Sequence, residues 1–224
     1  MERIMKLIGL TVVVCLLSGC VEKQVSVNNG DLNRELESPA EKAKKSKNEA
    51  GKVSDLKDEV LQMLPEPVEG FSWSLFKGVA IQRPVNWNEY SQGGTYCSSV
   101  ESVQQNGIFQ TGVTIQIIRD TQKNKNVSAA LAAGVLINDI EKLKENRKIF
   151  INFNKHDNLE TIVYRYRNAP QNMTPIIVHK YFQVSEKEDF MNIVTFETTE
   201  EKWDEYWKKY GEVILSKVVV YGVE

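Results

Sequence analysis

The sequence predicts an α+β domain in which helices flank an antiparallel β-sheet. Three observations support this prediction: a helix with one apolar face in the middle of the chain, three consecutive strands joined by short turns after it, and a second amphipathic helix near the end. The 224 residues are 42% hydrophobic, which suffices for one sizeable domain. The formal charge of -2 indicates neither a basic nucleic-acid surface nor an acidic block.

Residues 1–19 have the parts of an export signal. Arg3 and Lys6 are positive, an apolar run follows up to Leu17, and the small residues Ser18 and Gly19 precede Cys20. The apolar run is too short to span a bilayer. Leu17-Ser18-Gly19-Cys20 resembles the lipobox of bacterial lipoproteins. An ordinary secretory signal followed by an unrelated cysteine is the alternative.

The lipobox resemblance implies a signal peptide over 1–19, cleavage between Gly19 and Cys20, and a lipid anchor on Cys20. Several acyl chains on one residue are enough for stable membrane attachment. The residue after the cysteine is Val21 rather than aspartate. The resemblance therefore implies an outer-membrane lipoprotein that faces the periplasm.

Residues 20–66 are expected to form a lipidated, polar tether. Apolar residues are sparse, and Lys, Glu, Asn and Ser dominate, so the segment cannot bury enough surface to offset its ordering entropy. Lysines between Lys42 and Lys47 could contact anionic headgroups, but interspersed acids favour a solvated linker. One short helix is expected at the end, capped by Ser54 and stopped by Pro65.

The domain is assigned to residues 67–224. Its first elements are two short strands within Trp73 to Arg83, joined at Lys77-Gly78, and a strand over Thr111 to Arg119. A helix over Ser128 to Arg147 follows, with Ser128 as the candidate N-cap. Alanines on its apolar arc would permit close approach to a sheet.

Three strands are predicted next, over Glu160 to Arg167, Pro175 to Val184 and Phe190 to Glu197. Their connections are short, so they should pair antiparallel. A short strand over Lys148 to Asn154 is also expected.

The closing helix carries an aromatic stripe that includes Trp203 and Trp207. Thr198 and Glu201 have the spacing of a capping box. The stripe matches a buried face, so core packing is favoured over a ligand platform. A final edge strand is expected over Val218 to Tyr221.

Two segments carry a further resemblance. Phe76 to Trp87, a strand followed by proline and tryptophan, and Phe190 to Phe196 followed by the helix over Trp203 to Ser216, resemble the opening and closing elements of PsbP-like domains. That group includes the photosystem P subunit, Ran-binding Mog proteins and DcrB-like bacterial lipoproteins. The resemblance implies a PsbP-like α/β/α sandwich over about residues 71–221. It supplies no catalytic residue.

The search for chemistry finds few candidates. Cys97 is the one thiol left after processing, and a buried role is favoured over a reactive one. His156-Asp157 is a weak metal-site candidate because no third ligand stands nearby in the right pattern, and His179 fits a strand position. No catalytic residue, metal site or cofactor is assigned.

The predicted function is therefore a non-catalytic, membrane-anchored protein-binding module of the cell envelope, with an envelope protein as its partner. The candidate partner-binding residues are exposed aromatics at Trp87, Tyr90 and Tyr96, although a tryptophan folded under the sheet edge is an equal alternative for Trp87. Three other hypotheses remain: a small-ligand carrier with a pocket between helix and sheet, a periplasmic immunity protein against a toxin, and a hydrolase using Cys97 or the His156 cluster.

Overall fold

The computed structural model describes residues 58–92, 94–101 and 110–221. Cys20, the signal segment and most of the tether lie outside these residues. Among the described residues, none of the helices has the length and apolar character needed to cross a bilayer.

The chain forms two sheets. The large sheet has the strand order β3-β4-β5-β9-β8-β7-β6, and every neighbouring pair is antiparallel. Its strands are β3 (Asn88–Gln92), β4 (Thr95–Ser99), β5 (Gly112–Arg119), β6 (Asn146–His156), β7 (Leu159–Asn168), β8 (Ile176–Ser185) and β9 (Phe190–Thr199). The small sheet has the order β1-β2-β10, with β1 (Phe71–Phe76), β2 (Val79–Pro84) and β10 (Val219–Val220).

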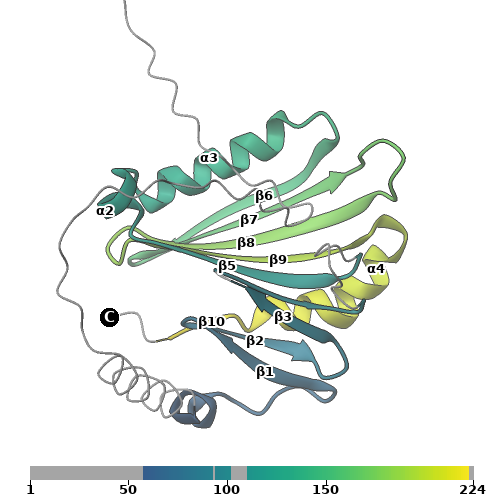
Figure 1. The fold of residues 1–224 in the computed structure, drawn as a ribbon, viewed down its shortest axis with the longest axis horizontal. Helices are drawn as coiled ribbons and strands as arrows, with labels where there is room; N and C mark the ends of the chain where they lie inside the picture. Colours follow the sequence, from purple (N-terminus) through teal and green to yellow (C-terminus); the bar gives the residue numbers. More distant parts are fainter. Residues whose placement is uncertain (1–57, 93, 102–109, 222–224) are drawn as a thin grey trace, which may run out of the picture.

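Helices cover both faces of the large sheet. They are α2 (Thr121–Lys125), α3 (Ala129–Lys142), and a closing segment of η1 (Glu200–Lys202), α4 (Trp203–Tyr206), η2 (Trp207–Gly211) and α5 (Glu212–Ser216). Figure 1 shows α3 on one side of the large sheet and the small sheet on the other. The predicted α+β class, an antiparallel sheet flanked by helices, is confirmed.

Each face of the large sheet has its own hydrophobic cluster. The cluster on the α3 face joins Ala129, Ala133 and Ile137 to strand residues that include Phe182 and Met191. The cluster on the opposite face joins strand residues such as Phe196 to the small sheet and the closing helix. Removal of apolar surface from water on both faces of the sheet is the main favourable contribution to the free energy of folding.

The first hairpin forms as predicted from its turn. Lys77 and Gly78 both have positive φ angles, 46° and 89°, and β1 pairs antiparallel with β2 on either side of them. Two consecutive residues with positive φ match the right-handed twist of hairpin strands. The expected final strand is present as β10, which pairs with β2 at Val79 and Ala80. Residues 58–63 are helical, while Ser54, the expected cap, lies outside the described residues.

The central helix begins where predicted and ends early. The Ser128 side chain accepts a hydrogen bond from the Leu131 amide, which is the expected N-cap. The helix stops at Lys142 rather than Arg147, because β6 starts at Asn146 and runs for 11 residues along β7. The helical periodicity of the sequence continues to Arg147, but pairing with β7 places Asn146 and Arg147 in a strand.

The strands β7, β8 and β9 confirm the predicted run of three. In contrast, β3, β4 and α2 are not predicted by the sequence pattern.

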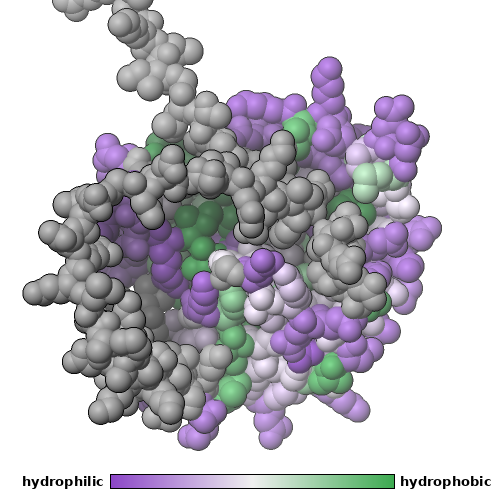
Figure 2. Space-filling view, in the orientation of Figure 1, coloured by the Kyte–Doolittle hydropathy of each residue, from purple (hydrophilic) through white to green (hydrophobic). Residues whose placement is uncertain are grey.

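In the space-filling view, hydrophilic residues dominate the rim of the described surface and hydrophobic ones show as separate patches (Figure 2).

The closing helix differs from the prediction at its start and in its middle. The capping-box prediction was wrong: β9 extends to Thr199, no side chain caps the next turn, and the Thr198 hydroxyl instead bonds the Thr111 hydroxyl at 2.8 Å inside the core. Its middle, Trp207–Gly211, is a π-helical turn. Such turns insert an extra residue into a helix.

Gly211 provides the space for the Trp207 ring. A Cβ at Gly211 would stand 2.5 Å from Cε3 of Trp207 and 3.1 Å from Cδ1 of Phe196. Both neighbours are rings, and Phe196 is fully buried, so neither can move away without loss of packing. The absence of a side chain at Gly211 is therefore what permits this turn to lie against β9.

We expect Gly211→Ala to lower the free energy of unfolding by about 1–3 kcal/mol, because overpacking outweighs the better helix propensity of alanine. Gly134→Ala is the matched control, since nothing lies within 4 Å of a Cβ there in α3, and it should raise stability by up to about 1 kcal/mol. Urea unfolding of both variants checks this. Equal stabilisation by the two substitutions would contradict the packing argument.

Candidate binding surface

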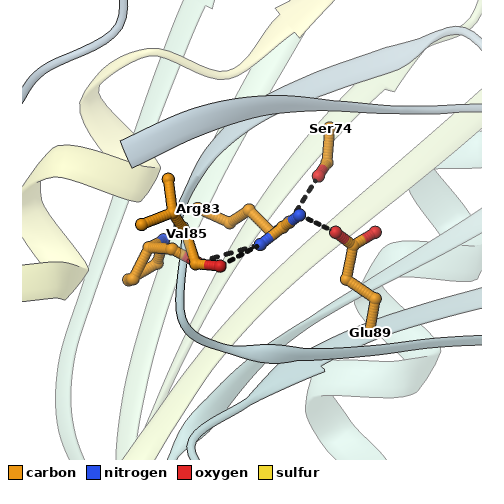
Figure 3. Close-up of polar contacts among 5 residues, drawn as sticks. Ser74, Arg83, Val85 and Glu89 are labelled. Atoms are coloured by element: carbon orange, nitrogen blue, oxygen red, sulfur yellow. Dashed lines mark hydrogen bonds and ion pairs between the residues drawn. The ribbon is translucent and has the colours of Figure 1, made fainter. Parts of the chain in front are cut away.

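Arg83 holds the small sheet against the edge of the large one. Its Nε donates to Oγ of Ser74 at 2.9 Å, and Nη1 donates to the carbonyl of Pro84 at 3.0 Å. Its second terminal nitrogen forms an ion pair with Glu89 on β3 (Figure 3). The guanidinium thus links β1, β2 and β3, and most of its donors bond to groups of the same chain.

A hollow of about 260 Å³ lies beside this clamp, between the small sheet and the β3–β4 hairpin. The residues that line it combine aromatic, aliphatic and charged groups: Leu61, Trp73, Ser74, Leu75, Arg83, Glu89 and Tyr96. The Trp73 indole donates to the carbonyl of Pro65 at 2.8 Å, which fixes one wall.

Of the three aromatics expected to be exposed, the structure exposes one. Tyr90 is 43% exposed, while Trp87 and Tyr96 are each 5% exposed. The Trp87 ring lies 5.1 Å from the Tyr210 ring of the closing helix, and the Tyr96 ring lies 5.8 Å from that of Phe76. For Trp87 the alternative of a ring folded under the sheet holds, and for Tyr96 the expectation of exposure was wrong, because both side chains pack in the cluster beneath the small sheet and closing helix. Only Tyr90 remains as a surface contact.

Cys97 lies in the interior of the α3 face. It is 5% exposed, and burial, followed by the charge of Glu197, raises the pKa of its thiol to about 12. A thiol with such a pKa is protonated at neutral pH and is a poor nucleophile. The requirement for a cysteine hydrolase, an exposed thiol beside a base, is not met here.

The two histidines lie away from Cys97. Cys97, Thr114, Thr195 and Lys180 follow one another across the sheet on the α3 face. Since side chains alternate along a strand, His179 points to the opposite face, where it packs on Trp207. His156 is at the end of β6, 88% exposed, with Nδ1 3.1 Å from a carboxylate oxygen of Asp157.

No cluster of three His, Cys, Asp or Glu side chains within the described part of the chain is arranged to hold a metal ion. The His156-Asp157 turn lines a second hollow, of about 320 Å³, with Ser185, Glu188, Phe190 and Val220 among its other residues. Besides Asp157, Glu188 is the only carboxylate in this lining.

A half-buried cation–aromatic stack is the feature that sequence reasoning missed. Arg165 Nε donates to Nδ1 of His179 at 3.1 Å, and the guanidinium carbon lies 4.5 Å from the ring centre of Trp207. It also lies 4.8 Å from Trp203, whose ring stacks on Trp207 at 5.1 Å. The stack joins β7, β8 and the closing helix. The aromatic stripe indicated burial of the helix, but nothing in the sequence paired it with Arg165.

Burial and the neighbouring Arg165 charge lower the pKa of His179 to about 3. The imidazole therefore stays neutral in the folded chain and accepts the hydrogen bond from Arg165. On the α3 face, burial raises the pKa of Glu197 to about 6, opposed by the charge of Lys180. Lys180 Nζ donates to Oγ1 of Thr195 at 3.0 Å, so the ammonium group has a hydrogen-bond partner inside the fold.

Comparison with solved structures finds proteins that resemble this chain at low sequence identity. The solution structure of cyanobacterial PsbP (CyanoP) from Synechocystis is 14% identical in sequence. The alignment covers 69% of this chain and 94% of the CyanoP chain, with a TM-score of 0.44. The Ran-binding protein Mog1p from Saccharomyces cerevisiae is 6% identical, with coverages of 67% and 95% and a TM-score of 0.43. A protein of unknown function from Pseudomonas aeruginosa is 13% identical, with coverages of 62% and 92% and a TM-score of 0.38. No family model and no curated protein matches the chain.

The depressed pKa of His179 predicts a specific acid sensitivity. Between pH 6.5 and about pH 3 the unfolded chain binds a proton at this histidine and the folded chain does not, so stability falls as the pH is lowered through that window. The loss should approach the order of 4 kcal/mol at its acid end. His179→Gln should flatten the dependence of the unfolding free energy on pH from 6.5 to 4. His156→Gln, at the exposed histidine, is the control and should keep the wild-type slope; identical slopes for all three proteins would refute the assignment.

Proposed function

We propose that this chain is a lipid-anchored protein of the bacterial cell envelope whose folded domain binds a protein partner and catalyses no reaction. The observation that carries the proposal is Leu17-Ser18-Gly19-Cys20 after a positive and apolar leader, since this pattern serves lipidation at the cysteine. The polar segment that follows Cys20 would then act as a tether between membrane and domain. Val21 favours the outer membrane, facing the periplasm.

The binding role is supported by the chemistry of the domain. Its thiol is buried and protonated, and its two histidines are separated from it, so the side chains present favour recognition over catalysis. The partner surface proposed here consists of Tyr90 and its neighbours on β3, all of which are exposed. Tyrosine supplies apolar area together with a hydroxyl, a combination that protein interfaces favour. An immunity protein that blocks a toxin would be one form of this function.

A small-ligand carrier is supported less well. That hypothesis placed a pocket between helix and sheet, and there Ala129, Ala133 and Ile137 pack against the sheet as part of one hydrophobic cluster. The two hollows described above lie beside β3 and at the hairpin ends. Both are bordered by exposed charged residues, whereas small-molecule sites are mostly enclosed and apolar.

We expect the purified wild-type chain to have the mass of residues 20–224 plus acyl chains and to fractionate with membranes. Cys20→Ala should abolish acylation and release the protein from the membrane or leave it unprocessed. Intact mass spectrometry with membrane fractionation measures both. Cys97→Ala is the control and should remain acylated and membrane-bound. An unacylated wild-type chain in the soluble fraction would overturn the anchor.

A photo-crosslinking phenylalanine analogue at position 90 should yield one adduct of defined mass in intact cells, because Tyr90 is exposed on the proposed surface. The same analogue at Trp87, which is buried, should yield none. Gln92→Lys, next to Tyr90 on the same face, should weaken the adduct by changing the charge of the surface. Adducts of equal yield at both positions, or none at position 90, would overturn this surface as the binding site while leaving the anchor untouched.

A further inference from the structure

The two edges of the large sheet differ in kind. The β3 edge is five residues long and polar, Asn88-Glu89-Tyr90-Ser91-Gln92. The β6 edge is 11 residues long, and its outer side pairs with no strand among the described residues. An edge strand presents free N–H and C=O groups to any strand that can lie beside it, and natural proteins commonly protect long edges with charge or Pro.

Exposed apolar side chains concentrate on β6. Ile149, Phe150 and Phe153 are 51%, 46% and 65% exposed, although they lie within five residues of one another. The segment from Ile149 to Asn154 contains no charged residue. An apolar, uncharged edge of this kind is typical of a strand that pairs with another strand.

The charges that flank this segment are neutralised within the chain. Lys148 Nζ lies 2.9 Å from Glu141, and Lys155 Nζ lies 2.5 Å from Glu160. The usual lysine protection of an edge is therefore weakened at both ends of the segment. A second strand with the same lysines would meet little repulsion, which permits pairing between identical copies.

The register of β6 is suited to a two-fold axis. A bulge between Lys148 and Phe150 divides the ladder on β7 into a short stretch up to Lys148 and a longer regular stretch from Phe150 to His156. An antiparallel pair centred on Asn152 places Ile151 opposite Phe153 of the second copy, and Phe153 opposite its Ile151. Both residues lie on the α3 face, since their β7 neighbours Tyr164 and Ile162 belong to the cluster on that face. Phe150, on the other face, would lie opposite an uncharged asparagine, Asn154.

We propose that two copies of this chain associate through β6, antiparallel and with the two-fold axis at Asn152, so that the two large sheets become one continuous sheet. Such an interface is isologous, because the same patch serves both copies. Each Phe153 gains an apolar cross-strand neighbour in place of water, and aromatic–β-branched pairs stabilise strand pairing. This interface lies at the opposite edge from Tyr90, so it leaves the partner surface of the proposed function accessible.

The test is a disulfide at the two-fold axis, formed in membranes from cells that express the full chain. Asn152→Cys brings a cysteine opposite its own copy, so mild oxidation should give a dimer band on a non-reducing gel. The parent chain, with its own Cys20 and Cys97, sets the background. Leu131→Cys is the matched control, since this residue is 59% exposed on the outer side of α3 and should give no dimer.

Adding Phe153→Glu to Asn152→Cys should reduce the dimer band by at least about tenfold, since each aromatic contact is replaced by a charge that lies opposite the apolar Ile151 of the second copy. Met173→Glu, at another exposed apolar residue, should leave the band unchanged. Sedimentation of the unmodified chain in detergent should give the mass of two chains. A monomer at every concentration, equal dimer bands from positions 152 and 131, or a position-152 adduct to a different protein would overturn the proposal. None of these results depends on whether Tyr90 binds a partner.

Discussion

The fold depends on covering β9 on both of its faces. This strand lies fourth in a seven-stranded sheet, and nine of its ten residues are buried. Met191 and Ile193 pack toward α3, while Val194 and Phe196 pack toward the small sheet and the closing helix. A strand that is apolar on both faces cannot be stable in a two-layer protein, so α3 on one side and the C-terminal elements on the other are required together.

The covering of the second face explains the aromatic character of the closing helix. Phe196 contacts the rings of both Trp203 and Trp207 at 6.0 Å, and Gly211 supplies the gap into which the Trp207 ring fits. The Arg165 guanidinium then lies over the rings of both tryptophans. The neutral His179 completes this arrangement, because a second positive charge beside Arg165 would be repelled in a buried site.

Periodicity in the sequence predicted elements whose apolar residues recur with the spacing of a helix or a strand. The apolar arc of α3 and the alternation in β5 are local signals, and both appear in the structure. By contrast, β3 reads Asn-Glu-Tyr-Ser-Gln and carries no apolar alternation, because neither of its faces is buried. Its strand identity comes from pairing with β4, a long-range contact that a local pattern cannot show. The Thr198–Glu201 spacing failed for the same reason, since pairing to β8 and a bond to Thr111 hold Thr198 in the strand.

The surface was less predictable than the fold, because an aromatic residue in a turn has the same sequence signature whether it faces the core or water. Trp87 and Tyr90 are only three residues apart. The turn between β2 and β3 directs the Trp87 side chain under the small sheet, whereas Tyr90 on β3 is exposed.

The same alternation decides what chemistry the domain can perform. Cys97 and His179 stand on strands of one sheet, and the register that aligns Cys97 with Lys180 puts the neighbouring His179 on the far side of the sheet. No choice of side-chain rotamer can bring groups on opposite faces of a sheet into hydrogen-bond contact. The two strands are also separated by β5 and β9, so even a slip of register that turned His179 to the face of Cys97 would leave the two side chains about 14 Å apart.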